Sequence, residues 1–240
     1  MELNDGLSII IPTYGTPEYL KECIQSIKNQ KNNFNYEILL GVDNCKETLQ
    51  HLKMNKDFYK GIKIYFFKNN VGPFIIKNTL INVVKNDKIL FFDSDDIMTE
   101  NMLSNFHKEI EHVDFIRFNY LNFSDNINKT LNEDLKADTI IGTKKNVLDK
   151  IIGFQPWICA ADTELYDRLV YNSKTQKTIE GISFYRRIHG KNLTIKKTTN
   201  HKSEIRKKYI DILNKNKTQN NWPNPENRVT EEYRKIKLFK

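Results

Sequence analysis

The stretch KILFFDSDDIM, residues 88–98, decides the fold, because in it an apolar run passes directly into an acidic cluster. The run at residues 89–92 is typical of a strand buried on both faces of a sheet. Asp93, Asp95 and Asp96 follow at once, and three carboxylates this close repel one another strongly at the end of a buried strand. A divalent cation would relieve the repulsion, and oxygen ligands of this kind suit Mg²⁺ or Mn²⁺.

The acidic cluster admits two other interpretations. A solvated turn ahead of the next helix is an alternative that the motif alone leaves open. An EF-hand loop is disfavoured, because its sixth position requires glycine and is Met98 here. A magnesium-type ion usually completes its coordination with waters and phosphate oxygens. The metal interpretation therefore predicts a nucleotide diphosphate as the partner.

The residues before this stretch alternate between strand and helix patterns. Apolar runs at residues 7–11, 37–42 and 62–67 predict three more strands. Thr16 and Pro17 are typical of a helix start, and Leu20, Cys23, Ile24 and Ile27 then recur at helical spacing. A second helical pattern follows Gly72 and Pro73, with apolar residues at Ile76, Leu80, Val83 and Val84. The order β-α-β-α-β-α-β predicts an α/β fold whose parallel sheet is covered on both faces and binds ligands at the carboxyl ends of its strands.

The residues after Asp96 show a less regular α+β pattern. We expect a helix over 100–111, strands over 115–121 and 139–142, a helix over 163–171 and a strand over 182–188. Residues 201–240 are basic, contain the turn-rich segment NNWPNPEN, and are predicted to add one or two helices. No internal repeat is visible.

Composition narrows the class of protein. The 240 residues suggest one large domain, or one domain with an appendage, that needs no disulfide or zinc to hold its core. An apolar fraction of 39% with 11% aromatic residues excludes a disordered chain. The apolar runs are far shorter than a membrane span, the N-terminus lacks a signal-peptide pattern, and three cysteines have no metal-ligand spacing. A cytoplasmic setting is therefore expected.

Four further polar residues are candidates for chemistry, each with a structural alternative. Asp43 follows the second strand and could accept a hydrogen bond from a nucleobase, or simply form a turn with Asn44. Asp162 precedes a helical pattern, where it could be a helix N-cap or a general base. Arg187 and His189 follow the last predicted strand and could contact a diphosphate or a metal, or be ordinary surface residues.

Five motifs in order make this sequence similar to the GT-A glycosyltransferases of family 2, over roughly residues 6–195. The opening SIIIPTYGTPEYLKECIQSIKNQ resembles the family's first strand and helix, and NNVGPFIIKN resembles its Asn-x-Gly segment. FFDSDDIM resembles the aspartate box, AADTELYDRL the helix start that carries the base, and Arg187-Ile188-His189 the late Arg-x-His. Each motif is weak alone, but five in the right order are specific.

The resemblance implies an inverting transfer of a sugar from a nucleotide diphosphate sugar, most often a UDP-sugar, with Asp162 as the catalytic base. Asp43, Thr13 and Tyr14 would line the base pocket, and the implied donor-binding set also includes Pro12, Asn70, Lys77, Asp93, Ser94, Asp95 and Arg187. Asp93, Asp95 and His189 would hold Mn²⁺ or Mg²⁺, and Trp157 and Glu164 would contact the acceptor. The implied acceptor is a glycan or lipid-linked glycan. Residues 1–98 would then be the donor-binding half of the domain, 99–200 the acceptor-binding half and 201–240 a basic helical extension.

Three departures from the family pattern concern nucleobase choice and acceptor contacts. Ala161 stands where the family usually has Glu, Lys77 where it has Arg, and Asp43-Asn44-Cys45 where it has Asp-Asp-Gly-Ser. The chain also has neither Gln-x-x-Arg-Trp nor an apolar span, features of the polymerising members. We therefore expect one sugar to be added per encounter.

Other classes of protein fit the sequence less well. A haloacid-dehalogenase-type phosphatase carries its aspartates on the first strand, and a nucleotidyltransferase would need a glycine-rich phosphate loop where IPTYGTPEYL stands. A non-catalytic module that binds nucleotides or anionic surfaces through the basic C-terminus is the remaining alternative. Acidic residues interrupt that segment, which favours a solvated helical face over nucleic-acid binding, while peripheral membrane contact stays a hypothesis.

Overall fold

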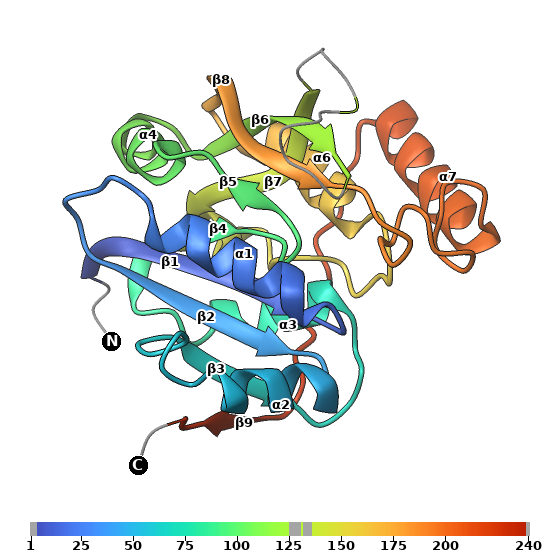
Figure 1. Cartoon of the computed structure of the whole chain (residues 1–240). Helices are drawn as coiled ribbons and strands as arrows, with labels where there is room; N and C mark the ends of the chain where they lie inside the picture. Colours follow the sequence, from blue (N-terminus) through green and yellow to red (C-terminus); the bar gives the residue numbers. More distant parts are fainter. Residues whose placement is uncertain (1–3, 125–130, 132–135, 239–240) are drawn as a thin grey trace.

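The computed structural model describes residues 4–124, 131 and 136–238, which build one nine-stranded sheet with helices on both faces (Figure 1). The four strands predicted first are confirmed as β1 (Asn4–Thr13), β2 (Tyr36–Val42), β3 (Lys63–Phe67) and β4 (Asn86–Phe91). They pair in parallel in the order β4-β1-β2-β3. This arrangement places their carboxyl ends at one edge of the sheet.

The second half of the chain extends the same sheet beyond β4. Strands β7 (Lys136–Lys144), β6 (Phe115–Phe123), β8 (Gln176–Arg187) and β5 (Ile97–Met98) follow in that order. Strand β7 is antiparallel to β4 and to β6, and β8 is parallel to β6. Because two antiparallel steps restore the direction, β8 ends at the same edge as β1, β2 and β4.

Successive side chains along the strands point to opposite faces of the sheet and pack into two separate cores. Ile9 and Ile11 pack with apolar residues of α1 (Pro17–Lys28), α2 (Lys46–Met54) and α4 (Met102–Glu109) on one face. Ile10 packs on the other face with α3 (Pro73–Ile81), α5 (Lys145–Lys150) and α6 (Ala161–Asn172). The predicted two-sided cover of the sheet is therefore confirmed, and the helical spacing of Leu20, Cys23, Ile24 and Ile27 forms the buried stripe of α1.

Gly41 in β2 explains how closely α3 lies on the sheet. A Cβ atom at this position would meet Cγ2 of Ile76 at 2.3 Å, so any side chain there would push the helix away. The distance matters for function, because the loop that enters α3 lies beside Asp43 at the end of β2. Gly72, the residue just before α3, has a φ of 81°, which favours glycine.

Several boundaries differ from those predicted. Helix α3 ends at Ile81, so Val83 and Val84 lie beyond it, and β8 begins at Gln176, six residues before the predicted start at 182. Strand β5 and helix α5 were not predicted, because two- and six-residue elements leave little periodicity to detect. Short 3₁₀ turn η1 (Ile110–His112) continues the predicted helix after α4.

Residues 201–240 are only partly the helical extension that the sequence predicts. They contain the single helix α7 (Glu204–Gln219), after which the chain returns to the sheet as β9 (Tyr233–Ile236). Strand β9 pairs antiparallel with β3 and covers that edge. The last strand depends on pairing with residues far away in the sequence, and its four-residue length gave no local signal.

The cysteines and the apolar helices bear on two features that the composition led us to consider, disulfides and membrane spans. Cys23, Cys45 and Cys159 are all free and buried. Among the residues that the structure describes, no helix combines the length and the apolar character needed to cross a bilayer.

Candidate active site

The predicted polar residues gather where four parallel strands end. Thr13 closes β1, Asp43 follows β2, the cluster 93–96 follows β4, and His189 comes shortly after β8. Their common location follows from strand direction, since β1, β2, β4 and β8 all run toward this edge. The sheet thus brings together residues up to 176 positions apart in sequence, as in the hydrogen bond between Lys191 and the Gly15 carbonyl.

Asp43 is 5% exposed and serves as an anchor for the loop before α3. Its Oδ1 accepts the N–H of Val71 at 2.7 Å, and its Oδ2 accepts the N–H of Gly72 at 3.0 Å. Burial raises the pKa of Asp43 above its ordinary value, although these two N–H groups act against the rise. Asn70 is exposed in the same loop, and its side-chain amide donates to the Asp43 carbonyl at 3.3 Å.

Asp93 is paired with a buried lysine. Lys77 Nζ lies 3.1 Å from Asp93 Oδ1, and the lysine is 5% exposed. The same ammonium lies 5.6 Å from the ring centre of Phe74 and 5.8 Å from that of Phe154. Cation–π contacts and the ion pair together keep this charge in a largely apolar setting. Lys77 thus reaches the acidic cluster through Asp93, while Asp93 itself stays about half exposed.

Asp95 contacts His189, the residue that was predicted to share a metal ion with it. His189 Nε2 lies 2.8 Å from Asp95 Oδ2, and Asn192 Nδ2 donates to the same oxygen at 3.0 Å. The backbone N–H of Lys191 donates to His189 Nδ1 at 3.2 Å, which places the ring proton on Nε2. Nε2 can therefore bind a cation only in the other neutral tautomer, in which the proton lies on Nδ1 and the Lys191 N–H no longer has this acceptor.

Arg187 is placed differently from its predicted role at the diphosphate. The residue is 2% exposed, its guanidinium pairs with Glu22, and it lies 4.3 Å from the ring centre of Tyr19 and 4.5 Å from that of Phe123. Its Nε donates to the carbonyl of Asp95 at 3.0 Å. Burial between two rings leaves no route to a ligand, so the prediction of a direct diphosphate contact is corrected: Arg187 holds the acidic loop from behind.

The third aspartate of the cluster is also structural. Asp96 is 3% exposed, and its Oδ1 accepts the backbone N–H of Arg187 at 2.9 Å. Burial raises the pKa of Asp96 well above its ordinary value, and the charges of Asp95 and Asp93 add to the rise. Ser94 between the first two aspartates is buried as well. Only Asp93 and Asp95 are therefore placed to present their side chains to a ligand.

The end of β1 forms another wall of this region. Pro12 and Thr13 are buried, whereas the neighbouring Tyr14 is 59% exposed. The hydroxyl of Thr13 is buried and has no hydrogen-bond partner among the described residues. An unpaired buried hydroxyl is costly unless a ligand or water completes it. This orphaned group at the strand end fits a site that binds a polar molecule.

Asp162 lies in the first turn of α6 but is not its N-cap. The helix begins at Ala161, and Ala160 occupies the N-cap position with a φ of 62°. A left-handed conformation is unusual for alanine and is typical of backbone held in place by its surroundings. Asp162 is half-buried and accepts the N–H of Thr163 at 2.9 Å. The structural alternative of an N-cap is therefore wrong, and the general-base hypothesis stays a prediction.

The two predicted acceptor residues have partners within the fold. Glu164 is 1% exposed, and its two carboxylate oxygens pair with Arg168 at 2.7 and 2.9 Å, so its predicted acceptor contact is corrected. Arg168 also donates to the carbonyl of Gly153 at 2.5 Å. Trp157 is half-buried, and the ring of Tyr209 in α7 stacks on it, with the ring centres 4.4 Å apart and an angle of 3° between the ring planes. The stacked face of Trp157 is not open to a sugar.

The donor set at this edge fits a hard divalent cation. Asp93, Asp95 and His189 offer carboxylate and imidazole ligands, a set that suits Mn²⁺ or Mg²⁺. Asp95 and His189 lie in contact with each other, whereas Asp93 is paired with Lys77. Among the described residues, the group that brings three ligand atoms within 4.8 Å of one another is instead Asp5, His107 and Glu111. Lys88 forms ion pairs with both carboxylates there and lies 3.3 Å from His107 Nε2, so an ammonium already neutralises that group. The edge with Asp95 is the better metal candidate.

Comparison with known proteins identifies the family. The model of the family described as Glycosyl transferase family 2 matches residues 8–170, which is more than half of the chain. This chain belongs to glycosyl transferase family 2. The matched range includes Asp43, Asp93, Asp95 and Asp162, whereas His189 and α7 lie beyond it.

Curated relatives of this family 2 chain are longer than it is. Glycosyltransferase GlyG of Streptococcus pneumoniae is 30% identical over 129 residues, covering 51% of this chain and 42% of that protein. Poly(ribitol-phosphate) beta-glucosyltransferase of Bacillus spizizenii is 35% identical over 109 residues, covering 43% of this chain and 17% of that protein. The chain thus spans less than half the length of these relatives.

Solved structures confirm the GT-A fold that the resemblance predicts. S. aureus TarS 1-349 in complex with UDP-GlcNAc matches with a TM-score of 0.63 and 19% identity, over 77% of this chain and 59% of that one. Mannosyltransferase PcManGT from Pyrobaculum calidifontis, in complex with GDP-Man and Mn²⁺, matches with a TM-score of 0.60 and 13% identity, over 78% of this chain and 58% of that one.

Three residues that contact the site were not predicted from the sequence. Asn192 bonds to Asp95 and, through its Oδ1, accepts the N–H of His189 at 2.6 Å. Lys191 Nζ donates to the Gly15 carbonyl at 2.7 Å, and the Tyr19 ring lies 4.9 Å from that of His189. An Asn three residues after a His is a turn signal that could have identified Asn192. Lys191 and Tyr19 carry no such signal, because their contacts are long-range.

Proposed function

We propose that this chain transfers a sugar from a nucleotide diphosphate sugar, with a UDP-sugar as the first candidate, to a hydroxyl of a glycan or lipid-linked glycan. The observation that carries the proposal is the meeting of Asp95 with His189 at the strand edge where Asp43 also lies. Family membership supports the reaction class. Fold neighbours that hold UDP-GlcNAc, UDP, or GDP-Man with Mn²⁺ support a nucleotide sugar as donor and a metal as cofactor.

In this proposal the donor lies across the carboxyl ends of β1, β2 and β4. Thr13, Tyr14 and Asp43 contact the nucleobase, with Asn70 at the rim of the same pocket. Asp93 and Asp95 face the ribose and the diphosphate, and Lys77 keeps Asp93 in position through their ion pair. When bound to Asp93, Asp95 and His189, a divalent cation supplies positive charge against the departing diphosphate.

The proposed reaction is a single displacement that inverts the anomeric carbon. The acceptor oxygen forms a bond to that carbon while the bond from the carbon to the diphosphate oxygen breaks. The electron pair of the broken bond leaves with the nucleoside diphosphate. Asp162 takes the proton of the acceptor hydroxyl. The first turn of α6 is a favourable place for this carboxylate, because the positive end of the helix dipole lies there.

Replacing the proposed base tests this function. Asp162→Asn keeps the shape of the side chain but cannot accept the proton, so we expect transfer to fall about 10²–10⁴-fold. The dissociation constant of UDP, measured by calorimetry with Mn²⁺, should stay within about twofold, because Asp162 does not contact the donor in this proposal. Glu180→Gln, at an exposed position of β8, is the matched control. Collapse of UDP binding in Asp162→Asn would show that the residue is structural.

A further inference from the structure

Nearly all of the excess positive charge of the molecule lies in one segment. Residues 190–220 contain nine Lys and Arg residues and two carboxylates, whereas the rest of the chain contains 29 and 28. Eight of the nine basic residues are exposed, and the ninth, Arg206, is half-buried. Because the net charge of the whole chain is +8, this segment forms its electropositive surface.

Helix α7 carries the centre of that segment and is fixed alongside α6. Tyr209 of α7 stacks on Trp157, just before the start of α6. Near the end of α7, Lys217 Nζ lies 3.0 Å from Oδ2 of Asp167 in α6. Arg206 Nε donates to the carbonyl of Thr199 at 2.6 Å, which ties the helix to the segment before it. In Figure 1, α7 lies beyond α6 on the side of the molecule toward which the arrowheads of β1 and β2 point. The basic surface is thus held in a fixed position on the side of the molecule where β1 and β2 end.

The start of α7 lies near the proposed base. Tyr209 of α7 stacks on Trp157, which precedes Asp162 by five residues, so the first half of α7 lies beside the turn that leads into α6. The charges of Arg206 and Asp162 both act on the Cys159 thiol, whose pKa burial raises, Arg206 lowers and Asp162 raises. An acceptor whose hydroxyl reaches Asp162 would pass within reach of the basic end of α7.

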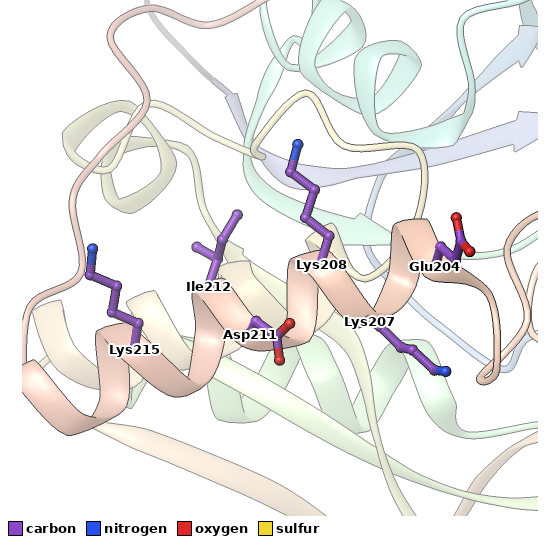
Figure 2. A pocket seen from close by; sticks show the side chains of 6 residues that line it. All are labelled: Glu204, Lys207, Lys208, Asp211, Ile212 and Lys215. Atoms are coloured by element: carbon purple, nitrogen blue, oxygen red, sulfur yellow. The ribbon is translucent and has the colours of Figure 1, made fainter.

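The exposed side of α7 forms an open groove with mixed charge. Figure 2 shows its lining residues: Glu204, Lys207, Lys208, Asp211, Ile212 and Lys215. Helices that bind membrane surfaces present a broad apolar face to the bilayer. In α7 Tyr209 and Leu213 are turned to the body of the protein. Ile210 is 37% exposed and Ile212 lines the groove, but lysines and two carboxylates surround them, so they form no broad apolar face. Lysines set between carboxylates suit a chain in which hydroxyl-bearing units separate the phosphates better than they suit the closely spaced phosphates of a nucleic acid, because ammonium groups bind the phosphates and carboxylates accept hydroxyl protons.

We propose that α7 and residues 190–203 bind the acceptor, and that this acceptor is a chain of sugar or polyol units joined by phosphodiesters. The inference rests on the proposed function, since it names the acceptor class of the same site. The lysines of the groove contact phosphates of the chain and hold a neighbouring unit near Asp162. Binding of this kind weakens as salt concentration rises, because each contact releases counterions.

A charge-reversal variant tests the surface without touching the donor site. The triple variant K207E/K208E/K215E changes three exposed residues of the groove, and K53E/K60E/K174E changes three exposed residues elsewhere by the same total charge. The probes are a synthetic glycerol phosphate oligomer, a neutral maltooligosaccharide of similar length and vesicles that contain phosphatidylglycerol. Binding is measured by calorimetry or co-sedimentation at low and high salt without nucleotide, and UDP binding with Mn²⁺ is measured separately.

We expect the wild type to bind the glycerol phosphate oligomer in preference to the neutral chain. The groove variant should bind it at least about tenfold more weakly, while the control variant stays within about twofold. Equal binding of the neutral chain, an unaffected groove variant, or binding to the vesicles alone would each overturn the proposal. Failure of UDP to bind would instead overturn the proposed function. The two results can be told apart, because binding of the glycerol phosphate oligomer is measured without nucleotide.

Discussion

Asp43 shows how one side chain can serve both the fold and the proposed donor site. Its two carboxylate oxygens accept the N–H groups of Val71 and Gly72, and thereby fix the loop that enters α3. Each carboxylate oxygen can accept more than one hydrogen bond, so the group can bind this loop and a nucleobase N–H together. The sequence predicted the nucleobase contact but could not predict the loop contacts, which join residues 28 and 29 positions apart.

Replacing Asp43 by Asn should affect stability and nucleotide binding together. Asn offers a single acceptor oxygen, so one of the two N–H groups would face the side-chain NH₂ instead. We expect Asp43→Asn to lower the free energy of unfolding by about 1–3 kcal/mol and to weaken UDP binding at least about tenfold. Urea denaturation and calorimetry measure the two effects, with Asp57→Asn in an exposed turn as control. Unchanged UDP affinity would remove Asp43 from the base pocket.

Burial of charged residues was the part of the site that the sequence could not predict. Glu164 lies in the same motif as Asp162, and nothing local distinguishes a carboxylate that faces a ligand from one that faces Arg168. The difference arises from the helix, because positions 162 and 164 point to different sides of α6. The predicted acceptor role failed for this reason, while the motif correctly marked the start of the helix.

The acidic loop after β4 depends on the end of β8 for its position. Arg187 binds the Asp95 carbonyl through its side chain and Asp96 Oδ1 through its backbone N–H. His189 and Asn192, just beyond, bind the Asp95 side chain. The strand order explains the contact, since the two-residue β5 follows the loop and pairs with β8. Arg187 is therefore a positioning residue.

Substitution of Arg187 should uncouple the loop from its support. In Arg187→Met the Asp95 carbonyl loses its side-chain donor, and we expect UDP affinity with Mn²⁺ to fall at least about tenfold, with a much smaller change when metal is absent. Arg187→Lys should not restore binding, because an ammonium cannot reproduce the planar guanidinium between Tyr19 and Phe123. In Glu22→Gln the Asp95 contact persists, so affinity should change less. Equal losses with and without Mn²⁺ would point to general disruption of the fold.

Glu37 joins the starts of neighbouring strands at the opposite edge of the sheet. Its Oε1 accepts from the Ser8 hydroxyl at 2.7 Å and from the N–H of Lys85 at 2.6 Å, and its Oε2 pairs with Lys63. Burial acts to raise the pKa of Glu37, but hydrogen bonds from Lys63, Lys85 and Ser8 lower it below its ordinary value. The ionised group therefore stabilises the fold above the unfolded pKa, and this stabilisation is lost as pH falls through the folded pKa.

This linkage gives a pH-dependent prediction. Glu37→Gln should lower the free energy of unfolding by about 1–3 kcal/mol at pH 7, because it removes the charge-assisted bonds. The difference from wild type should shrink as pH falls from the ordinary glutamate pKa of 4.5 through the lower pKa of the folded protein, because the wild-type carboxylate then becomes protonated as well. Urea denaturation at pH 7 and at a pH well below 4.5 measures the difference in the free energy of unfolding, with Glu180→Gln as the control variant. A difference that stays constant with pH would show that the charge of Glu37 contributes nothing.

The sequence predicted the architecture of the first half of the molecule better than that of the second half. Strands β1 to β4 are joined by helices, so each strand is identified by local periodicity and its direction follows from the connections. Strand β9 returns from the end of the chain to cover β3, and its Tyr233 ring lies 5.1 Å from that of Tyr65. Pairing across 160 or more residues has no local signature, which is why a helical extension was predicted there.

A thermal-shift panel tests most directly whether the carboxyl edge binds a nucleotide diphosphate together with a metal. UDP, GDP, CDP and dTDP are each added with and without Mn²⁺. A ligand at about a hundred times its dissociation constant stabilises the folded state by about 2.7 kcal/mol, enough to raise the melting temperature measurably. We predict stabilisation by one nucleotide, UDP first, that requires Mn²⁺ and disappears in Asp95→Ala. Absence of a shift with every nucleotide, or a shift that Asp95→Ala leaves intact, would show that this edge is not a metal-dependent nucleotide site.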